Sequence, residues 1–427
     1  MSETVLLVGG GGREHAIARA LADDCTLYAC AANRNPGIAS LADGFETIGA
    51  RAAEPIREYA ESVGATLAVI GPESALEAGV ADALADAEVY PFGPEAAQAR
   101  IETDKAFQRR FMREHSIPGC PEFETFDDAG AAADYVAEVD GDVAVKPRGL
   151  TGGKGVRVSG DQLTKTETVE YVRESDYDSW VIEERLIGEE FTVQAFVANG
   201  EVRPTPAVQD HKRAYEGDEG PNTGGMGSYS DAAFELPFMT EADYDRAVAI
   251  LEATVDALDD YTGVLYGQFM LTADGVRVVE FNARFGDPEA MNTLPVMETP
   301  FIDVLTAARD GDPLPELAFA PRATVCKYAV PAGYPTDPEA GARVTVDPDS
   351  VGDALLFYAS VDERDGGLYT TTSRSFAVVG VADTIAAAER QASDALAAVG
   401  DGLRVREDVG TPSLVESRVE HVERLRE

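Results

Sequence analysis

The chain of 427 residues carries 77 Asp and Glu but only 35 Lys and Arg, which gives a formal net charge of −42 at pH 7. Its length suits about two to four domains, and a composition of 44% hydrophobic and 8% aromatic residues is globular in spite of the acidity. Because so negative a field repels phosphate backbones and anionic lipids, the charge excludes nucleic acids and membranes as expected partners.

The first hundred residues alternate between strand and helix patterns. Strands are expected over residues 4–9, 26–32, 66–70 and 88–92, and a helix over residues 13–21. This rhythm predicts a doubly wound parallel sheet in an N-terminal domain of residues 1–101. An amphipathic helix is expected over residues 103–115, and Pro118 marks a boundary after it because proline disfavours helical geometry in the preceding residue.

The remaining chain divides into three expected parts, without a long linker or a repeat between them. Residues 119–190 combine short strands and helices in a small α+β unit, residues 191–322 hold longer strands, and residues 323–427 form a strand-rich C-terminal domain. Strands are expected at residues 143–146, 155–158, 180–184, 191–197, 265–271 and 276–281, and helices at 241–258 and 382–399.

A glycine run, residues 9–12, connects the first strand to the first helix. Bare backbone N–H groups at the positive end of a helix suit a phosphate, and the guanidinium of Arg13 could clamp that phosphate. The run lacks the dinucleotide fingerprint because position 14 is Glu instead of Gly, and a tight turn without a ligand is the alternative.

A second glycine-rich loop lies between Lys146 and Lys154. It is not a P-loop, because Arg148 and Gly155 stand where that motif needs Gly and Ser or Thr. Two lysines around a flexible loop can cover a triphosphate as a lid, and the alternative is a basic hairpin. Since the whole chain has only six Lys, we interpret this pair as retained for chemistry.

An apolar strand that ends in carboxylates follows at residues 181–190. Its acidic residues could accept hydrogen bonds from the adenine amino group and the ribose hydroxyls. Taken alone, the segment is equally well explained as a solvated acidic turn, because acidic residues occur throughout this chain.

The segment of residues 209–227 joins a basic cluster to a run rich in Gly and Pro, and it predicts a loop shaped around a ligand. Further along, Glu280 and Asn282 share one face of an apolar strand, because side chains alternate along a strand. Two oxygen ligands completed by nucleotide phosphates suit Mg²⁺, and Gln268 could join them across a hairpin. The alternatives are a disordered surface loop for the first segment and a polar strand face for the second.

The termini, the apolar segments and the cysteines indicate the compartment. The chain enters its first apolar run without the basic segment of a signal peptide, and no apolar stretch approaches the ~20 residues of a membrane span. The four Cys (25, 30, 120 and 326) form no CxxC motif and no Cys/His metal spacing, so we expect inert thiols in a reducing cytoplasm. An acidic surface poor in Lys is typical of salt-saturated cells and favours a halophilic archaeon as the source, an acidic protein of an ordinary cell being the alternative.

Taken in order, these segments resemble the phosphoribosylamine–glycine ligase (glycinamide ribonucleotide synthetase) family of the ATP-grasp superfamily. The resemblance extends over nearly the whole chain, and its most specific strings are DHKR…GPNTGGMG in residues 210–227 and EFNARFGDPE in residues 280–289. It also includes VGGGGREHA (8–16), IGPE (70–73), FGP (92–94), TDKAF (103–107), residues 146–156 and 181–190, and GYP (333–335). Asn33 and Arg34 depart from the Pro-Gly that the family often has in that turn.

The resemblance implies a fold and a reaction. Residues 102–118 and 191–322 would form the ATP-grasp central domain, and residues 119–190 its lid subdomain. ATP would phosphorylate the carboxylate of glycine, and the amine of 5-phosphoribosylamine would attack the acyl phosphate to give glycinamide ribonucleotide, ADP and phosphate. Phosphoryl transfer needs positioning and charge neutralisation more than a nucleophilic side chain, and the sequence offers no nucleophile set.

The resemblance also implies roles for individual residues. The residues implied for ATP are Lys105, Lys146 and Lys154 at the phosphates, Glu183, Glu184 and Leu186 at adenine, and Glu190 at the ribose. Those implied for Mg²⁺ or Mn²⁺ are Gln268, Glu280 and Asn282. The residues implied for glycine and phosphoribosylamine are Gly10, Gly11, Gly12, Arg13, Asn35, Glu73, Asp210, His211, Lys212, Gly225, Met226, Gly227, Arg284 and Asp287. Arg284, Lys154 and Asp210 are the candidate catalytic residues.

Two other functions stay open. One is a different ATP-grasp carboxylate–amine ligase or carboxylase of purine metabolism, and the other is a catalytically silent nucleotide-binding protein. We expect a monomer or a weak oligomer that binds small molecules, and we expect most of the six Lys to converge on one cleft.

Overall fold

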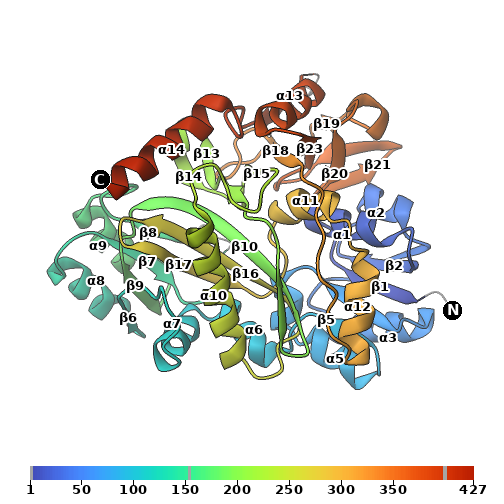
Figure 1. Ribbon diagram of the computed structural model, residues 1–427, viewed down its shortest axis with the longest axis horizontal. Coiled ribbons are helices and arrows are strands. Elements are labelled where there is room, and N and C mark those ends of the chain that lie inside the picture. The colour runs from blue at the N-terminus through green and yellow to red at the C-terminus, as the bar shows by residue number, and fades with distance from the viewer. Residues whose placement is uncertain (1–2, 152–154, 398–401) are drawn as a thin grey trace.

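The computed structural model describes residues 3–151, 155–397 and 402–427 (Figure 1). Its N-terminal part is the predicted parallel sheet, with the strand order β3-β2-β1-β4-β5. The strands are β1 (Thr4–Val8), β2 (Thr26–Ala31), β3 (Gly44–Thr47), β4 (Leu67–Ile70) and β5 (Tyr90–Phe92). The helices are α1 (Gly12–Leu21), α2 (Pro36–Leu41), α3 (Ala53–Val63), α4 (Glu73–Glu77) and α5 (Val80–Asp86).

Helices cover both faces of this sheet, as a doubly wound fold requires. Leu6 and Val8 of β1 pack with α3 and α5, whereas the alternate residues Val5 and Leu7 pack with α1. β3 was not among the predicted strands. β5 begins two residues later than predicted, because Glu88 has φ 60° in the turn that precedes it.

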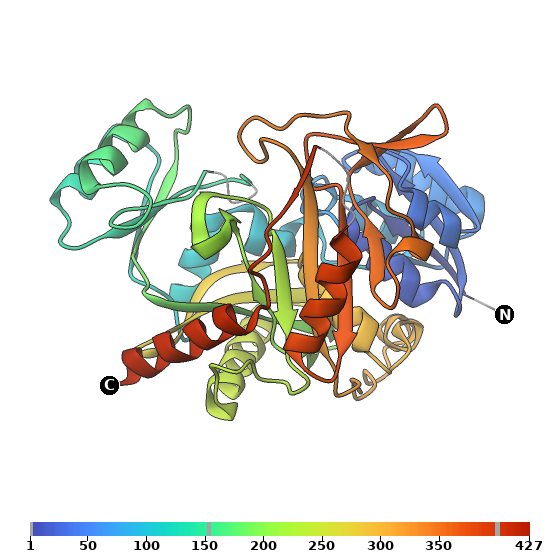
Figure 2. The same ribbon diagram turned by 90° about the horizontal axis from the view of Figure 1, so that it is seen from above.

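The segment predicted as the lid contains a four-stranded antiparallel sheet of order β6-β9-β7-β8, and Figure 2 shows it at one end of the molecule, away from the N-terminal sheet. Trp180, Val145 and Ile182 form its core together with residues of both lid helices. Its elements are β6 (Phe123–Phe126), α8 (Ala129–Glu138), β7 (Val143–Pro147), β8 (Arg157–Val158), α9 (Lys165–Glu174) and β9 (Trp180–Glu184).

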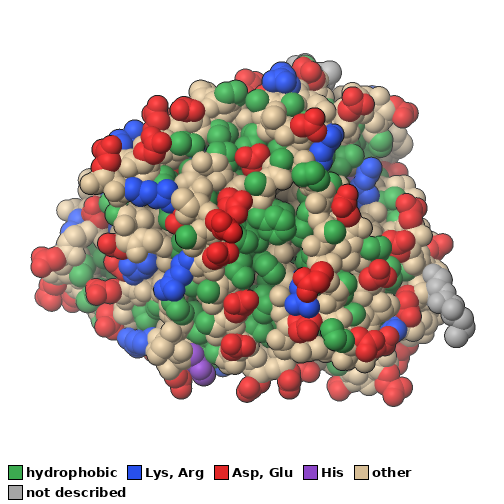
Figure 3. Space-filling model, in the orientation of Figure 1, with side chains coloured by type: hydrophobic (Ala, Val, Ile, Leu, Met, Phe, Trp, Pro, Cys, Tyr) green, Lys and Arg blue, Asp and Glu red, His purple; other side chains and the backbone are tan. Residues whose placement is uncertain are grey.

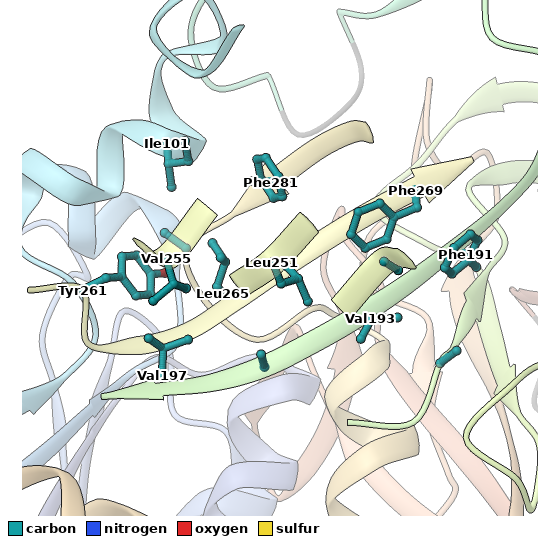
Figure 4. Packing of buried hydrophobic residues seen from close by; sticks show 14 of the residues in the cluster. Ile101, Phe191, Val193, Val197, Leu251, Val255, Tyr261, Leu265, Phe269 and Phe281 are labelled. Atoms are coloured by element: carbon teal, nitrogen blue, oxygen red, sulfur yellow. The ribbon is translucent and has the colours of Figure 1, made fainter. Parts of the chain in front are cut away.

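The central sheet has the order β11-β10-β16-β17, and Phe191, Phe269 and Phe281 pack between it and α10 with Leu251 (Figure 4). Its strands are β10 (Gly188–Ala198), β11 (Glu201–Pro204), β16 (Gly263–Thr272) and β17 (Gly275–Asn282). The helices of this region are α6 (Ala96–Thr103), α7 (Lys105–Glu114), α10 (Glu241–Ala257), α11 (Glu289–Thr293) and α12 (Phe301–Asp310).

The helix predicted at residues 103–115 is observed as α7, and its first predicted residue, Thr103, belongs to the preceding helix α6. α7 begins at Lys105 because the side chain of Asp104 caps it by accepting a hydrogen bond from the N–H of Phe107 at 3.0 Å. α6 ends one residue before this cap. The strands of residues 265–271 and 276–281 are confirmed as the hairpin of β16 and β17.

The C-terminal sheet has the order β12-β15-β18-β23-β20, and β24 also pairs with β18. The segment expected as a loop therefore contains short strands, because the backbone of β15 pairs with β18, about a hundred residues further along the chain. Its elements are β12 (Gln209–Asp210), β13 (Arg213–Tyr215), β14 (Glu219–Asn222), β15 (Gly227–Ser230), β18 (Ala323–Pro331), β20 (Leu355–Tyr358), β23 (Phe376–Ala382), α13 (Ile385–Leu396), β24 (Leu403–Val405) and α14 (Pro412–Arg426). A small sheet of β19 (Arg343–Val344), β22 (Gly367–Thr370) and β21 (Val361–Arg364) lies beside it.

The prediction of a helix over residues 382–399 is confirmed for residues 385–396, and residues 398 and 399 lie outside the described part. α14 was not predicted. The division at residues 190 and 322 stays a prediction, since one sheet contains strands from both sides of residue 322.

On the face of the molecule seen in Figure 3, acidic side chains are scattered, with few basic ones between them. All four Cys are free thiols. Within the described ranges, no helix is both long and apolar enough to cross a membrane.

Candidate functional site

Two adjoining cavities lie between the N-terminal sheet, the central sheet and the lid. The first, the N-terminal cavity, has a volume of about 440 Å³ and is lined by Gly10, Glu73 and Arg284 among others. The second, the lid cavity, has a volume of about 420 Å³ and is lined by Lys146, Leu186 and Glu190 among others. The two share the lining residues Val156, Asp210, Lys212, Thr223 and Glu280, so they meet at one junction.

The N-terminal cavity opens at the carboxyl ends of parallel strands, where open α/β sheets bind ligands. Gly9–Gly11 follow β1, Ala32 and Asn33 follow β2, and Pro72 and Glu73 follow β4, and all of them line the cavity. The predicted glycine run is therefore at the cavity wall, at the start of α1.

The glycine run already holds a carboxylate. The N–H of Gly11 donates to Glu14 Oε2 at 2.6 Å, and Arg13 Nε donates to Glu14 Oε1 at 2.7 Å. Arg13 Nη1 also donates to the carbonyl oxygen of Phe285 at 3.0 Å. The Nε atom of Arg13, the predicted phosphate clamp, is thus already bound to Glu14, the residue that replaces a glycine of the dinucleotide fingerprint.

Several residues implied for the substrates lie behind the cavity walls and hold them in place. Asn35 is fully buried, caps α2 through Oδ1, and donates from Nδ2 to the carbonyl oxygens of Gly10 and Tyr358 at 2.9 and 2.7 Å. The residues of this group that line neither cavity are Gly12, Asn35, Gly225, Met226 and Gly227.

Arg284 lies between two carboxylates in the N-terminal cavity. Its Nη2 is 2.8 Å from Glu102 Oε1, and its Nε is 3.6 Å from Glu73 Oε2. Burial raises the pKa of Glu102 to about 7, even though Arg284 opposes the rise. Glu102 was not predicted, and its only sequence signal is an acidic residue directly before the TDKAF string.

Arg374 is a second residue that the sequence did not reveal. Its Nη2 is 3.1 Å from Asp287 Oδ2, and its Nη1 donates to the carbonyl oxygens of Gly224 and Gly225 at 2.6 and 3.0 Å. The hydroxyl of Tyr328 also donates to Asp287 at 2.6 Å. The predicted glycine loop and Asp287 are therefore held by C-terminal residues.

Three of the lysines implied for ATP or substrate gather around Glu280 at the junction. Burial alone would raise the pKa of Glu280, but the ammonium groups of Lys212, Lys105 and Lys146 lower it to about 2. The fourth, Lys154, lies outside the described residues, whereas Lys165 is on α9 and Lys327 is buried in β18.

Asp210 also lies at the junction, but its pKa is shifted in the opposite direction from that of Glu280. Burial and the carboxylate of Glu289 raise its pKa well above the ordinary value. Its Oδ1 accepts a hydrogen bond from the N–H of His211 at 2.7 Å. The junction thus combines an ionised carboxylate, Glu280, with one that binds a proton readily.

The residues implied for the metal separate into two groups. Glu280 and Asn282 line the N-terminal cavity from one face of β17, as the alternation predicted. Gln268 lies opposite Glu280 in the register of β16 and β17, but its amide is bound to Lys212 and Glu190. In the described part of the chain, His, Cys, Asp and Glu form no group of three that could hold a metal ion.

All the described residues implied for the adenosine part line the lid cavity. Glu183, however, is buried in an ion pair with Arg109, with Nε–Oε1 and Nη2–Oε2 distances of 2.7 and 2.9 Å, and its Oε2 is 2.8 Å from Lys146 Nζ. Its carboxylate therefore fixes Lys146 and β9. Leu186 and Glu190 remain at the cavity wall.

His211 lies in the lid cavity, whereas the resemblance had placed it with the acceptor substrates. Arg418 and His421 of α14 line the same cavity and were not predicted. The segment of residues 213–218 is attached to the C-terminal segment, where Arg406 Nη2 is 2.8 Å from Asp218 and Arg406 Nη1 donates to the carbonyl oxygen of Arg213 at 3.1 Å.

A parallel-sheet domain, a lid and a central sheet that enclose a lysine-rich junction define an ATP-dependent ligase of the ATP-grasp class. Family models agree: those for the N, ATP-grasp (A) and C domains of phosphoribosylglycinamide synthetase match residues 3–102, 103–290 and 324–412. The chain belongs to the phosphoribosylglycinamide synthetase family.

Individual relatives give the same result. The chain is 52% identical to phosphoribosylamine–glycine ligases of Methanosarcina barkeri and Methanococcoides burtonii, over 99% of this chain and 99% of each relative. The crystal structure of phosphoribosylamine–glycine ligase from Thermotoga maritima is 27% identical, with a TM-score of 0.79 over 95% of this chain and 99% of that one. The resemblance in the sequence is thereby confirmed.

Proposed function

We propose that the chain joins glycine to 5-phosphoribosylamine with the conversion of ATP to ADP and phosphate, an early step of purine biosynthesis. The named relatives support this reaction because each of them matches this chain over 99% of its own length. The observation that carries the proposal is the junction, where Asp210, Lys212 and Glu280 line both cavities at once.

The junction suits a reaction between two ligands. ATP in the lid cavity would direct its triphosphate toward Lys105, Lys146 and Lys212, whose charges neutralise the transferred phosphoryl group. A carboxylate oxygen of glycine attacks the γ-phosphorus and ADP leaves. The amine nitrogen of phosphoribosylamine then attacks the acyl carbon, phosphate leaves, and the nitrogen releases a proton.

We assign the remaining roles as follows. Arg284 orients the glycine carboxylate, since a guanidinium binds a carboxylate in a defined geometry. Asp210 accepts the amine proton, because its raised pKa suits a proton acceptor. Glycine-run residues Gly10 and Gly11, with Glu73 and Asp287, surround the acceptor substrate. Lys154 contacts the phosphates on the strength of the resemblance alone.

A divalent cation, Mg²⁺ or Mn²⁺, fits Glu280 and Asn282, because an ionised carboxylate and an amide oxygen on one strand face are suitable donors. Gln268 fits less well, since Lys212 and Glu190 engage its amide. When bound, the ion would supply charge neutralisation beside the phosphates.

We also propose a cytoplasmic protein of a halophilic cell, a monomer or weak oligomer that binds neither nucleic acid nor membranes. The net charge of −42 with only six Lys supports this proposal.

The test measures ADP release from ATP with phosphoribosylamine, generated in the assay, in molar KCl, with and without glycine. We expect release to depend on glycine. ADP release that depends on bicarbonate or formate instead of glycine would identify another ligase of purine metabolism. ATP binding without ADP release would identify a silent nucleotide-binding protein. Either result overturns the proposal.

A further inference from the structure

His211 is a buried polar ring whose own hydrogen-bonding groups are unused. Only 3% of the residue is exposed, it lines the lid cavity, and neither Nδ1 nor Nε2 has a hydrogen-bond partner in the part of the chain that the structure describes. The backbone of His211 is fixed by two hydrogen bonds: its N–H donates to the carbonyl oxygen of Gly227 at 2.9 Å, and its carbonyl oxygen accepts from the N–H of Met226 at 2.8 Å. Because buried polar groups are nearly always paired, a ring held in this position indicates a partner in the cavity.

The wall around His211 is continuous with Glu190. The ring packs against Tyr229, with centroids 5.8 Å apart, and the hydroxyl of Tyr229 donates to Gln209 Oε1 at 2.6 Å. Gln209 Nε2 in turn donates to the carbonyl oxygen of Glu190 at 3.0 Å. His211 therefore belongs to the side of the lid cavity that carries Glu190, which the resemblance assigns to the ribose.

Helix α14 completes this wall and sets its charge. His421 Nδ1 is 2.6 Å from Glu189 Oε1, and Arg418 Nε is 3.4 Å from Glu189 Oε2. Burial, followed by the guanidinium groups of Arg406 and Arg418, lowers the pKa of His211 to about 3.

A neutral imidazole has one N–H donor and one nitrogen acceptor. A hydroxyl group, which also donates and accepts, can use both functions of such a ring, whereas a phosphate offers only acceptors. The cationic groups suited to phosphates lie at the junction, around Glu280. The nucleoside part of the nucleotide is thus the better match for His211.

We propose that His211 binds a ribose hydroxyl of ATP and makes the enzyme selective for ribonucleotides. The proposal rests on the proposed function, and it moves His211 from the acceptor substrates to the nucleotide.

The experiment compares His211→Phe with the unchanged protein on ATP, 2′-deoxy-ATP and 3′-deoxy-ATP. We expect the unchanged protein to prefer ATP over one of the deoxy analogues by about tenfold in kcat/KM, the effect of one hydrogen bond. The variant should lose about tenfold with ATP, mostly in KM, and nothing with that analogue, while the KM for glycine stays the same. His211→Asn or His211→Gln, each with a donor and an acceptor, should restore part of the preference.

His115→Phe, the same change at an exposed histidine that lines neither cavity, is the matched control. Equal losses with all three nucleotides, no loss, or a change confined to the KM for glycine would overturn the inference. Calorimetric titration with the same nucleotides measures binding without turnover. Failure to bind any of them therefore contradicts the proposed function, whereas binding without the hydroxyl preference contradicts only the assignment of His211.

Discussion

The charged side chains of the N-terminal cavity are mostly paired with one another, whereas the lid cavity contains a polar ring without a partner. Arg13 pairs with Glu14, Arg284 with Glu102, and Arg374 with Asp287, at N–O distances of 2.7 to 3.1 Å. His211, in contrast, has no hydrogen bond from its ring to any residue that the structure describes.

This difference indicates two ways of preparing a site. In the N-terminal cavity, a charged ligand must compete with carboxylates that already hold the cations, so binding there is an exchange of partners. At His211 in the lid cavity, a ligand would add a hydrogen bond without displacing one. Glu280 lines both cavities, so its substitution should affect both ATP and glycine. A substitution in one cavity should affect only one of these substrates, and a substitution behind the walls should affect stability alone.

The largest effect is expected for Glu280→Gln. The change removes the negative charge that faces three lysines, and with it an ionised ligand for the proposed metal ion, while it keeps the shape of the side chain. We expect kcat/KM to fall at least about a hundredfold for both ATP and glycine. Glu420→Gln, at an exposed glutamate of α14, is the control and should have normal activity. Retention of a tenth of the activity by Glu280→Gln would contradict its role at the junction.

Arg284→Met should affect the N-terminal cavity alone. We expect the KM for glycine to rise more than about tenfold, and the free energy of unfolding to fall by about 3 kcal/mol because buried Glu102 loses its cation. Equilibrium denaturation and steady-state kinetics measure the two effects. Adding Glu102→Gln should restore stability but not glycine binding. An equal rise in the KM for ATP would show that the two cavities are not independent.

Acid should destabilise the protein through His15, which lies behind the N-terminal cavity and accepts a hydrogen bond from the N–H of Tyr358 on Nδ1 at 2.8 Å. Burial lowers its pKa from the ordinary 6.5 to about 4. Below pH 6.5 the unfolded chain therefore binds a proton that the folded chain excludes, and stability falls as the pH falls toward 4, by up to about 1.4 kcal/mol per pH unit.

Denaturation at a series of pH values measures this slope. His15→Asn should reduce this slope by about 1.4 kcal/mol per pH unit, the contribution of one proton, without changing the KM for ATP. His211→Asn should change both the slope and the KM for ATP. An unchanged slope in His15→Asn would show that other groups dominate acid unfolding.

The smallest effect is expected for Arg418→Gln in α14. The change removes the two partly exposed ion pairs of Arg418, with Glu189 and with Asp218, from the wall of the lid cavity, so the KM for ATP should rise by about two- to fivefold with the KM for glycine unchanged. Arg424→Gln, an exposed site on the same helix, is the matched control. A larger rise in the KM for glycine than in the KM for ATP would contradict the assignment of α14 to the ATP-binding wall of the lid cavity.

Features that depend on neighbouring residues were predicted well. The parallel sheet, the glycine run before α1, and the shared face of Glu280 and Asn282 follow from periods of a few residues. The convergence of Lys105, Lys146 and Lys212 was also expected, since few lysines occur outside the family motifs.

Features that depend on distant pairing were not predicted. Arg374 binds the carbonyl oxygen of Gly224 across 150 residues, and Arg418 reaches Asp218 across 200. No local pattern encodes these contacts, and α14 itself is too polar for its role to be visible in its spacing.

The sequence alone therefore determined the class of fold, the family and the kinds of groups that line the two cavities, because motifs and periodicities are written along the chain. The tertiary structure decided which cavity each group faces. It placed His211 at the lid cavity, paired Glu183 with Arg109, and set the carboxylate of Glu14 against the glycine run, because burial and pairing depend on residues that are close in space and far apart in sequence.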